Sequence, residues 1–159
     1  MFKPSKISHP LLAALTIAGV VAAAPAAFAG ECPADKMKPN VRPMVDYKPV
    51  GVTDVTLGSI NLEKQPAAIK DRELRFRKLT IEPGGIVPWH SHADRPALIY
   101  IVSGAIYENA SNCAVPILHQ AGEVARETHA TSHWWQNTGK VPVVLLSFDI
   151  QHDPNDHNM

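Results

Sequence analysis

Two histidines separated by one serine occur in the segment PWHSHADRPALIY, residues 88–100. Side chains two residues apart in a strand point to the same face, so His90 and His92 lie together if this segment is extended. Pro88 and the preceding Gly84-Gly85 pair favour an extended backbone here. Two imidazoles on one face could bind zinc or iron, but such an ion needs at least a third protein ligand.

His133 is the best candidate for the third ligand. In the segment HWWQNTG, residues 133–139, strand alternation places His133, Trp135 and Asn137 on one face and Trp134 on the other. The remaining histidines of the chain after residue 30 are His119, His129, His152 and His157. The alternative at this point is that His90, His92 and His133 are ordinary polar residues on the open face of a sheet.

The aromatic residues near these histidines favour core packing first, because each buries a large apolar area. Trp135 shares a face with His133, so it is the best candidate to line a pocket for a flat organic molecule. Trp89 and Asn137 are further candidates for such a pocket. Tyr100 and His129 are the candidate proton donors, although a polar turn residue is the simpler interpretation of His129.

The elements that must position these residues are predicted to be strands. Eight short apolar or β-branched runs alternate with glycine-containing turns, a pattern typical of an all-β sandwich or barrel. The runs are 51–60, 74–81, 98–102, 105–107, 115–119, 123–126, 133–136 and 141–150. One short helix is predicted over 66–72, where alanine and lysine are frequent.

The ends of the chain differ from this pattern. Residues 1–29 resemble an export signal, with Lys3 and Lys6 before an apolar run too short to span a bilayer, and with small residues at a cleavage site after Ala29. Residues 30–49 are rich in proline and predict an extended arm, residues 50–150 a single barrel domain, and residues 151–159 a polar tail.

Because of this export signal, we expect the protein in the periplasm or outside the cell. Disulfides persist there, so a bridge between Cys32 and Cys113 is favoured over two unpaired thiols. Glu31 stands where a lipid-attachment site needs a small residue, so the sequence predicts no membrane anchor after signal removal. Without residues 1–29 the chain has two more acidic than basic residues, which gives no indication of a nucleic acid partner.

The spacing of the histidines resembles the cupin superfamily. Its first motif is similar to GIVPWHSHADRPALIYIVSG, residues 85–104, and its second to GEVARETHATSHWWQN, residues 122–137. The chain departs from the family at Ala97, where a glutamate ligand is usual, and at Thr128 and Ala130, where the second motif usually has Pro-x-Gly. The resemblance implies a jelly-roll barrel, also called a double-stranded β-helix, with His90, His92 and His133 facing its interior.

The resemblance also implies a function. Three neutral imidazoles leave a divalent ion with its full charge and with open coordination positions, which suits a small chelating anion. Three-histidine cupins include iron dioxygenases that act on enolic or phenolic molecules, so Fe(II) is favoured, with zinc, manganese, copper and nickel as alternatives. A non-catalytic ligand-binding or metal-binding cupin and a metal-free barrel are the competing predictions, and a homodimer is expected. The acidic residues near the motifs, Glu108, Glu123 and Glu127, are expected on the surface.

Overall fold

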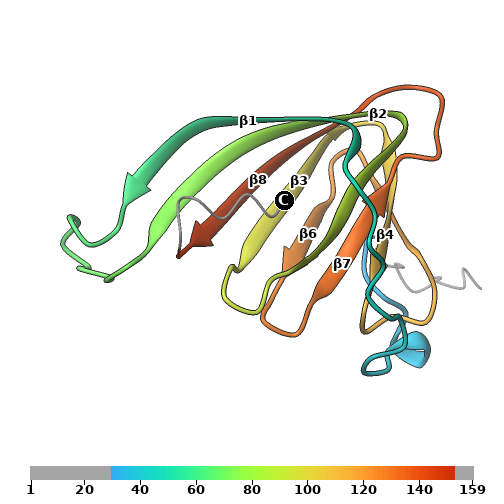
Figure 1. Cartoon of the computed structure of the whole chain (residues 1–159), viewed down its shortest axis with the longest axis horizontal. Coiled ribbons are helices and arrows are strands. Elements are labelled where there is room, and N and C mark those ends of the chain that lie inside the picture. The colour runs from blue at the N-terminus through green and yellow to red at the C-terminus, as the bar shows by residue number, and fades with distance from the viewer. Residues whose placement is uncertain (1–29, 153–159) are drawn as a thin grey trace, which may run out of the picture.

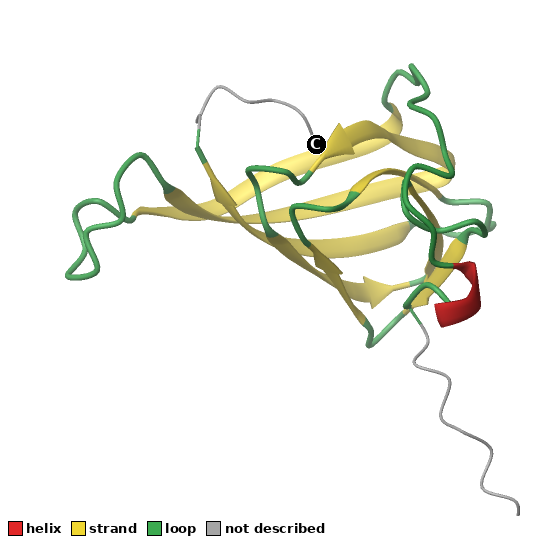
Figure 2. Cartoon of the chain, turned by 90° about the horizontal axis from the view of Figure 1, so that it is seen from below, coloured by secondary structure: helices red, strands yellow, loops and turns green. Residues whose placement is uncertain are grey.

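The fold is all-β, as the sequence predicts. The computed structural model describes residues 30–152, and its strands wrap around a common interior (Figures 1 and 2). The elements are η1 Ala34–Lys36, β1 Val50–Asn61, β2 Glu73–Ser91, β3 Ala97–Ser103, β4 Ala105–Ala110, β5 Ile117–Gln120, β6 Val124–Glu127, β7 Ser132–Gln136 and β8 Val143–Gln151. Each predicted run corresponds to one of these strands.

The predicted helix over 66–72 is wrong. These residues form turns between β1 and β2, and Ala68 and Asp71 have positive φ values of 47° and 53°. A right-handed helix cannot accommodate residues in the left-handed region, so the local composition was overridden by the turn.

The strands form one antiparallel sheet in the order β5-β4-β7-β2-β8-β3-β6, with β1 paired to β2. The first half of β2 pairs with β1 and β8, and its second half pairs with β7. The predicted turn at Gly84-Gly85 is a bend inside this long strand. A β-carbon on Gly85 would lie 2.7 Å from the carbonyl oxygen of Glu82, so only glycine fits, and the bend brings His90 opposite His133.

The interior is filled by alternate residues of the strands. In β3 and β8, buried and more exposed positions alternate along the strand, as expected when one face of a sheet covers a core. The main cluster consists of Leu79, Ile81, Val87, Ile99, Ile101, Ile106, Ala125, Trp135, Val143 and Leu145. Burial of these side chains stabilises the barrel by about 25 cal/mol per Å² of apolar surface.

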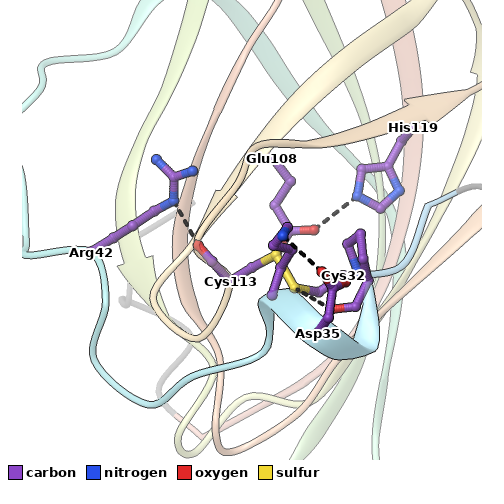
Figure 3. Close-up of a disulfide and its surroundings, with 8 residues drawn as sticks. Cys32, Asp35, Arg42, Glu108, Cys113 and His119 are labelled. Atoms are coloured by element: carbon purple, nitrogen blue, oxygen red, sulfur yellow. Dashed lines mark hydrogen bonds and ion pairs between the residues drawn. A yellow bond between two sulfur atoms is a disulfide. The ribbon is translucent and has the colours of Figure 1, made fainter.

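The proline-rich arm lies against the loop between β4 and β5. Cys32 and Cys113 form a disulfide, which confirms the predicted pairing (Figure 3). Backbone hydrogen bonds continue the contact, from Lys38 N–H to Asn112 and from Val41 N–H to Ser111. The arm therefore forms part of the domain's surface and does not stand apart from it.

Two predicted segments fall largely outside the described residues. The expected export signal occupies residues 1–29, and most of the expected polar tail occupies residues 153–159. Gln151, predicted to begin the tail, instead ends β8, where it is paired with Glu73 of β2 and buried, and its Nε2 donates to the Glu73 carboxylate. Within residues 30–152, no helix has the length and apolar character needed to cross a membrane.

Candidate metal centre

The structure brings His90, His92 and His133 together inside the barrel. His90 lies near the end of β2, His92 follows that strand, and His133 lies on β7 directly opposite His90. The three Nε2 atoms form a triangle with separations of 3.1 Å, 3.0 Å and 3.0 Å. All three side chains are buried.

The opposite nitrogen of each ring determines what this triangle can do. Nδ1 of His90 lies 2.9 Å from the carbonyl oxygen of Pro88, and Nδ1 of His92 lies 2.6 Å from that of Arg95. Nδ1 of His133 lies 2.8 Å from a carboxylate oxygen of Glu108. These oxygens only accept hydrogen bonds, so each Nδ1 carries a proton, and in the neutral form of each ring Nε2 presents a lone pair. Three lone pairs then converge on one point.

This arrangement fits a metal ion. Neutral imidazoles with Nδ1–H bound to a carbonyl or carboxylate oxygen are the usual form of ligating histidines. Nitrogens 3.0–3.1 Å apart could all reach one ion at the usual metal–nitrogen distance of about 2.0–2.1 Å. Three protein ligands would leave further coordination positions for other ligands.

The electrostatics keep two of the three rings neutral. Burial, together with the neighbouring imidazoles, holds the pKa of His90 well below its usual value, and burial is the main cause that lowers the pKa of His92 to about 3. Burial also disfavours the charged form of His133, but Glu127 and Glu108 outweigh it and raise the pKa of this ring. His90 and His92 therefore offer free lone pairs throughout the physiological pH range.

Glu108 and Glu127 correct the expectation that these residues lie on the surface. They are only 5 % and 3 % exposed, and both point toward His133. Burial by itself would raise the pKa of Glu108, but hydrogen bonds with His119 and His133 hold it at about 2. Burial raises the pKa of Glu127 to about 7. Glu108 is therefore the permanent anion that orients His133.

Two hollows meet at His92. An internal cavity of about 20 Å³ is lined by His90 and His92 and by Arg77 and Trp135, and has room for about one water molecule. An open hollow of about 410 Å³ is also lined by His92, with His129 on its wall. His92 therefore borders both the small cavity and the open hollow.

The comparisons with known proteins agree with this geometry. A cupin domain family model matches residues 77–149, which contain all three histidines. The chain belongs to the cupin superfamily. No curated protein sequence matches it.

Solved cupin-like structures show the same fold at low sequence identity. A Klebsiella pneumoniae protein with a double-stranded β-helix domain is 18% identical, with a TM-score of 0.51 over 72% of this chain and 85% of that one. A predicted oxalate decarboxylase from Thermotoga maritima is 19% identical, with a TM-score of 0.50 over 76% and 97%. An oxalate oxidase bound to the substrate analogue glycolate is 17% identical, with a TM-score of 0.51 over 66% and 53%.

This cupin lacks a carboxylate at the position where the family glutamate was expected. Ala97 is buried, so the position faces the interior, but it carries only a methyl group. Glu127 lies directly opposite Ala97 on the adjacent strand β6, and its Oε2 is 3.5 Å from Nδ1 of His133. A buried carboxylate thus lies beside Ala97, but it faces Nδ1 of His133 and not the Nε2 atom that belongs to the triangle.

Of the two tryptophans predicted to line the pocket, Trp135 lines the cavity and Trp89 does not. Trp135 is 1 % exposed, lines the internal cavity and packs edge-on against His133 with ring centroids 5.5 Å apart. Trp89 precedes His90 along β2 and lies half-buried on the other face of the strand, so alternation directs it away from the site. Trp135 is the aromatic wall of this cupin's cavity, and Trp89 is not.

Asn137 is a structural residue, which corrects its prediction as a pocket residue. Its Nδ2 donates to the carbonyl oxygens of Ile81 and Val141, and its Oδ1 accepts a hydrogen bond from Gly139 N–H. The side chain is fully buried. The hydrogen bonds of the Asn137 amide therefore close the turn before β8, and the amide is not available to a ligand.

Asn137→Ala should destabilise the protein by about 3 kcal/mol, because it removes three hydrogen bonds, one of them to the carbonyl oxygen of the fully buried Ile81. Urea unfolding of the oxidised protein measures this change. The control is Gln120→Ala at an exposed position, which should cost less than about 0.5 kcal/mol. Equal effects of the two substitutions would contradict the structural role of Asn137.

The two predicted proton donors lie in different places, and one of them, His129, lies near the candidate metal centre. Tyr100 is 40 % exposed and alternates with the buried residues Ile99 and Ile101, so it lies on the outer face of β3, away from the histidines. Its prediction as a proton donor is therefore corrected by the register of the strand. His129 is exposed in the loop between β6 and β7 and lines the open hollow together with His92.

Glu108→Ala should weaken metal binding 10- to 100-fold, the usual effect of removing a partner that orients a ligating histidine. Glu108→Gln should have a smaller effect, because the amide oxygen can still accept the Nδ1 proton of His133. Competition with a fluorescent chelator measures the affinity. Exposed Glu82→Gln is the matched control, and a Glu108→Ala affinity equal to its affinity would contradict the positioning role.

Proposed function

We propose that this cupin is a metal-dependent oxidoreductase of the dioxygenase type, with His90, His92 and His133 as the metal ligands. The convergence of three Nε2 atoms 3.0–3.1 Å apart carries this proposal, since one cation can accept the lone pairs of all three neutral rings. Fe(II) is the favoured ion, and zinc, manganese, copper and nickel are the alternatives.

The bound ion would act as a Lewis acid and redox centre for a substrate and molecular oxygen. The protein contributes the remaining features. Among residues 30–152, no carboxylate lines the small cavity beside the Nε2 triangle, so a bound ion would retain its positive charge, while the Arg77 guanidinium in the same lining is paired with Asp54 and Asp149. Trp135 excludes water from one wall. His129, on the wall of the open hollow, is the remaining candidate to carry a proton to or from solvent.

The substrate class is a small chelating anion. The internal cavity admits a molecule no larger than water or dioxygen, so the organic substrate has to approach through the hollow beside His92. Enolic and phenolic anions meet these requirements. Small carboxylates such as oxalate and glycolate also meet them, and the neighbouring structures include an oxalate oxidase bound to glycolate and a predicted oxalate decarboxylase.

We also propose that the protein is exported and cut after Ala29, so that it works in the periplasm or outside the cell. The Ala27-Phe28-Ala29 segment and the disulfide between Cys32 and Cys113 support this proposal, since disulfides persist in oxidising compartments. The mature chain would start at Gly30.

A homodimer is the expected assembly. Leu98, Tyr100, Val102 and Phe148 are exposed on the outer face of β3 and β8, and β3 is also apolar on its inner face. Strands that are apolar on both faces are typical of sheets covered on both sides. Light scattering of the purified protein should give twice the mass of one chain, and a monomer would contradict this assembly.

Oxygen consumption tests the enzymatic proposal. The chain from Gly30, without a histidine tag, is loaded anaerobically with Fe(II), Mn(II) or Zn(II) and mixed with oxalate, glycolate, a catechol or a 1,3-diketone. We expect oxygen uptake and product formation with one redox-active metal and one of these anions. Tight binding of an anion without any product would favour the alternative, a ligand-binding cupin, for which the very small internal cavity is the supporting observation.

A further inference from the structure

His119 is a buried histidine outside the candidate metal triad. It is 0 % exposed, and its ring stacks on Trp135 with centroids 4.7 Å apart. Its Nε2 lies 2.8 Å from Oε2 of Glu108, whose other oxygen binds His133. Its Nδ1 is buried and has no hydrogen-bond partner among the described residues. A buried nitrogen of this kind requires explanation, because such atoms are nearly always paired.

The chemistry of Glu108 determines which partner is missing. Glu108 is ionised and can only accept hydrogen bonds, so Nε2 of His119 must donate to it. In the neutral ring the proton on Nε2 leaves a lone pair on Nδ1. A hydrogen-bond donor placed beside Nδ1 would pair this lone pair.

Gly30 lies at this position. A β-carbon added to Gly30 would stand 2.9 Å from Nδ1 of His119 and 3.0 Å from Oε2 of Glu123, closer than a side chain normally approaches. Figure 3 shows the start of the described chain passing beside the ring of His119. The backbone nitrogen of Gly30 is one bond of about 1.46 Å from the same Cα. Only glycine allows the backbone to come so close.

We propose that the α-amino group released by cleavage after Ala29 binds at this position, donating to Nδ1 of His119 and pairing with the carboxylate of Glu123. An ammonium group has three N–H donors and a positive charge, whereas the amide of an uncut chain has one donor and none. This inference rests on the processing proposed above. It does not depend on whether the cupin turns over a substrate.

The docked amino group would complete a continuous hydrogen-bonded path. The path runs from Gly30 through His119 and Glu108 to His133. Glu31 already pairs with Arg126, whereas Glu123 binds a neutral backbone donor, the N–H of Gln120, and keeps its charge for the amino group. Gly30 and Glu108 both line a hollow of about 210 Å³ between the arm and the barrel, and the ionised Glu108 adds negative potential there. Removal of the signal would thereby fix the orientation of a metal ligand.

The titration of the α-amino group tests this proposal. The metal-free oxidised chain starting at Gly30 is labelled by ¹³C reductive methylation and followed by NMR between pH 6 and about pH 10, the range that spans the ordinary α-amino pKa of about 7.7–8.0. We expect the pKa of this group to lie about one pH unit above that value. Glu123→Gln should return it to the ordinary value, and the exposed control Glu63→Gln should leave it raised.

A second chain, with Phe28-Ala29 retained before Gly30, should unfold about 3–6 °C lower, since it loses the charge pair. Intact mass of the full-length protein after export should show Gly30 as its first residue. An ordinary α-amino pKa in the Gly30 chain would overturn docking even if processing occurs there. A different first residue would overturn the processing on which docking rests, and neither result would bear on oxygen uptake.

Discussion

His133→Ala abolishes stoichiometric metal binding, the largest effect that we expect from a single substitution. The wild-type chain should bind about one transition-metal ion, because its three ligands are preorganised by Pro88, Arg95 and Glu108. The variant keeps only the two ligands His90 and His92, and two imidazoles are fewer than the three protein ligands of an open metal site. Elemental analysis after dialysis measures the metal bound per chain.

A matched control separates this effect from general damage. His129→Ala removes an imidazole from the hollow beside His92 but none from the Nε2 triangle, so it should retain the full complement of metal. Circular dichroism should show the same strand content in all three proteins. Retention of metal by His133→Ala would contradict the three-histidine centre, as would its loss from His129→Ala to the same extent.

Replacing both cysteines by serine should lower the free energy of unfolding by about 4 kcal/mol, because the disulfide closes a loop of more than 80 residues in the unfolded chain. Denaturant unfolding of Cys32→Ser/Cys113→Ser against the oxidised wild-type protein measures the difference. Wild-type protein treated with a reductant should behave like the double variant. A change below about 1 kcal/mol would show that the arm remains in place without its covalent link.

The disulfide also bears on the metal centre. Cys113 lies three residues beyond Ala110, which is paired with His133 across β4 and β7. The arm and the barrel enclose a hollow of about 210 Å³ whose lining includes Glu108 and Glu127. Loss of the disulfide should therefore weaken metal binding as well as stability. The same chelator competition that tests Glu108→Ala measures this second effect.

Local features of the sequence were sufficient to predict the strands and the paired ligands. Alternation placed His90 and His92 on one face and Trp135 beside His133, because a strand has a period of two residues wherever it occurs. Cysteine pairing followed from the expected compartment. The bend at Gly84-Gly85 was visible as a glycine pair, but its role inside a continuous strand depends on the carbonyl of Glu82 and on pairing with two different partners.

The carboxylates could be identified only from the tertiary structure. Glutamate is usually exposed, so Glu108 and Glu127 were expected on the surface, although each has an apolar residue two positions away on its own face. Their burial depends on imidazoles that come from other strands: His119 and His133 supply the hydrogen bonds that compensate for desolvation of Glu108.

The inward position of Asn137 followed from the strand period, but the hydrogen bonds of its amide to Ile81 and Val141 depend on how distant segments pack together. The sequence alone therefore determined to which face of its strand each side chain points. What each side chain contacts was decided only by the tertiary structure, because those contacts join residues far apart in the chain.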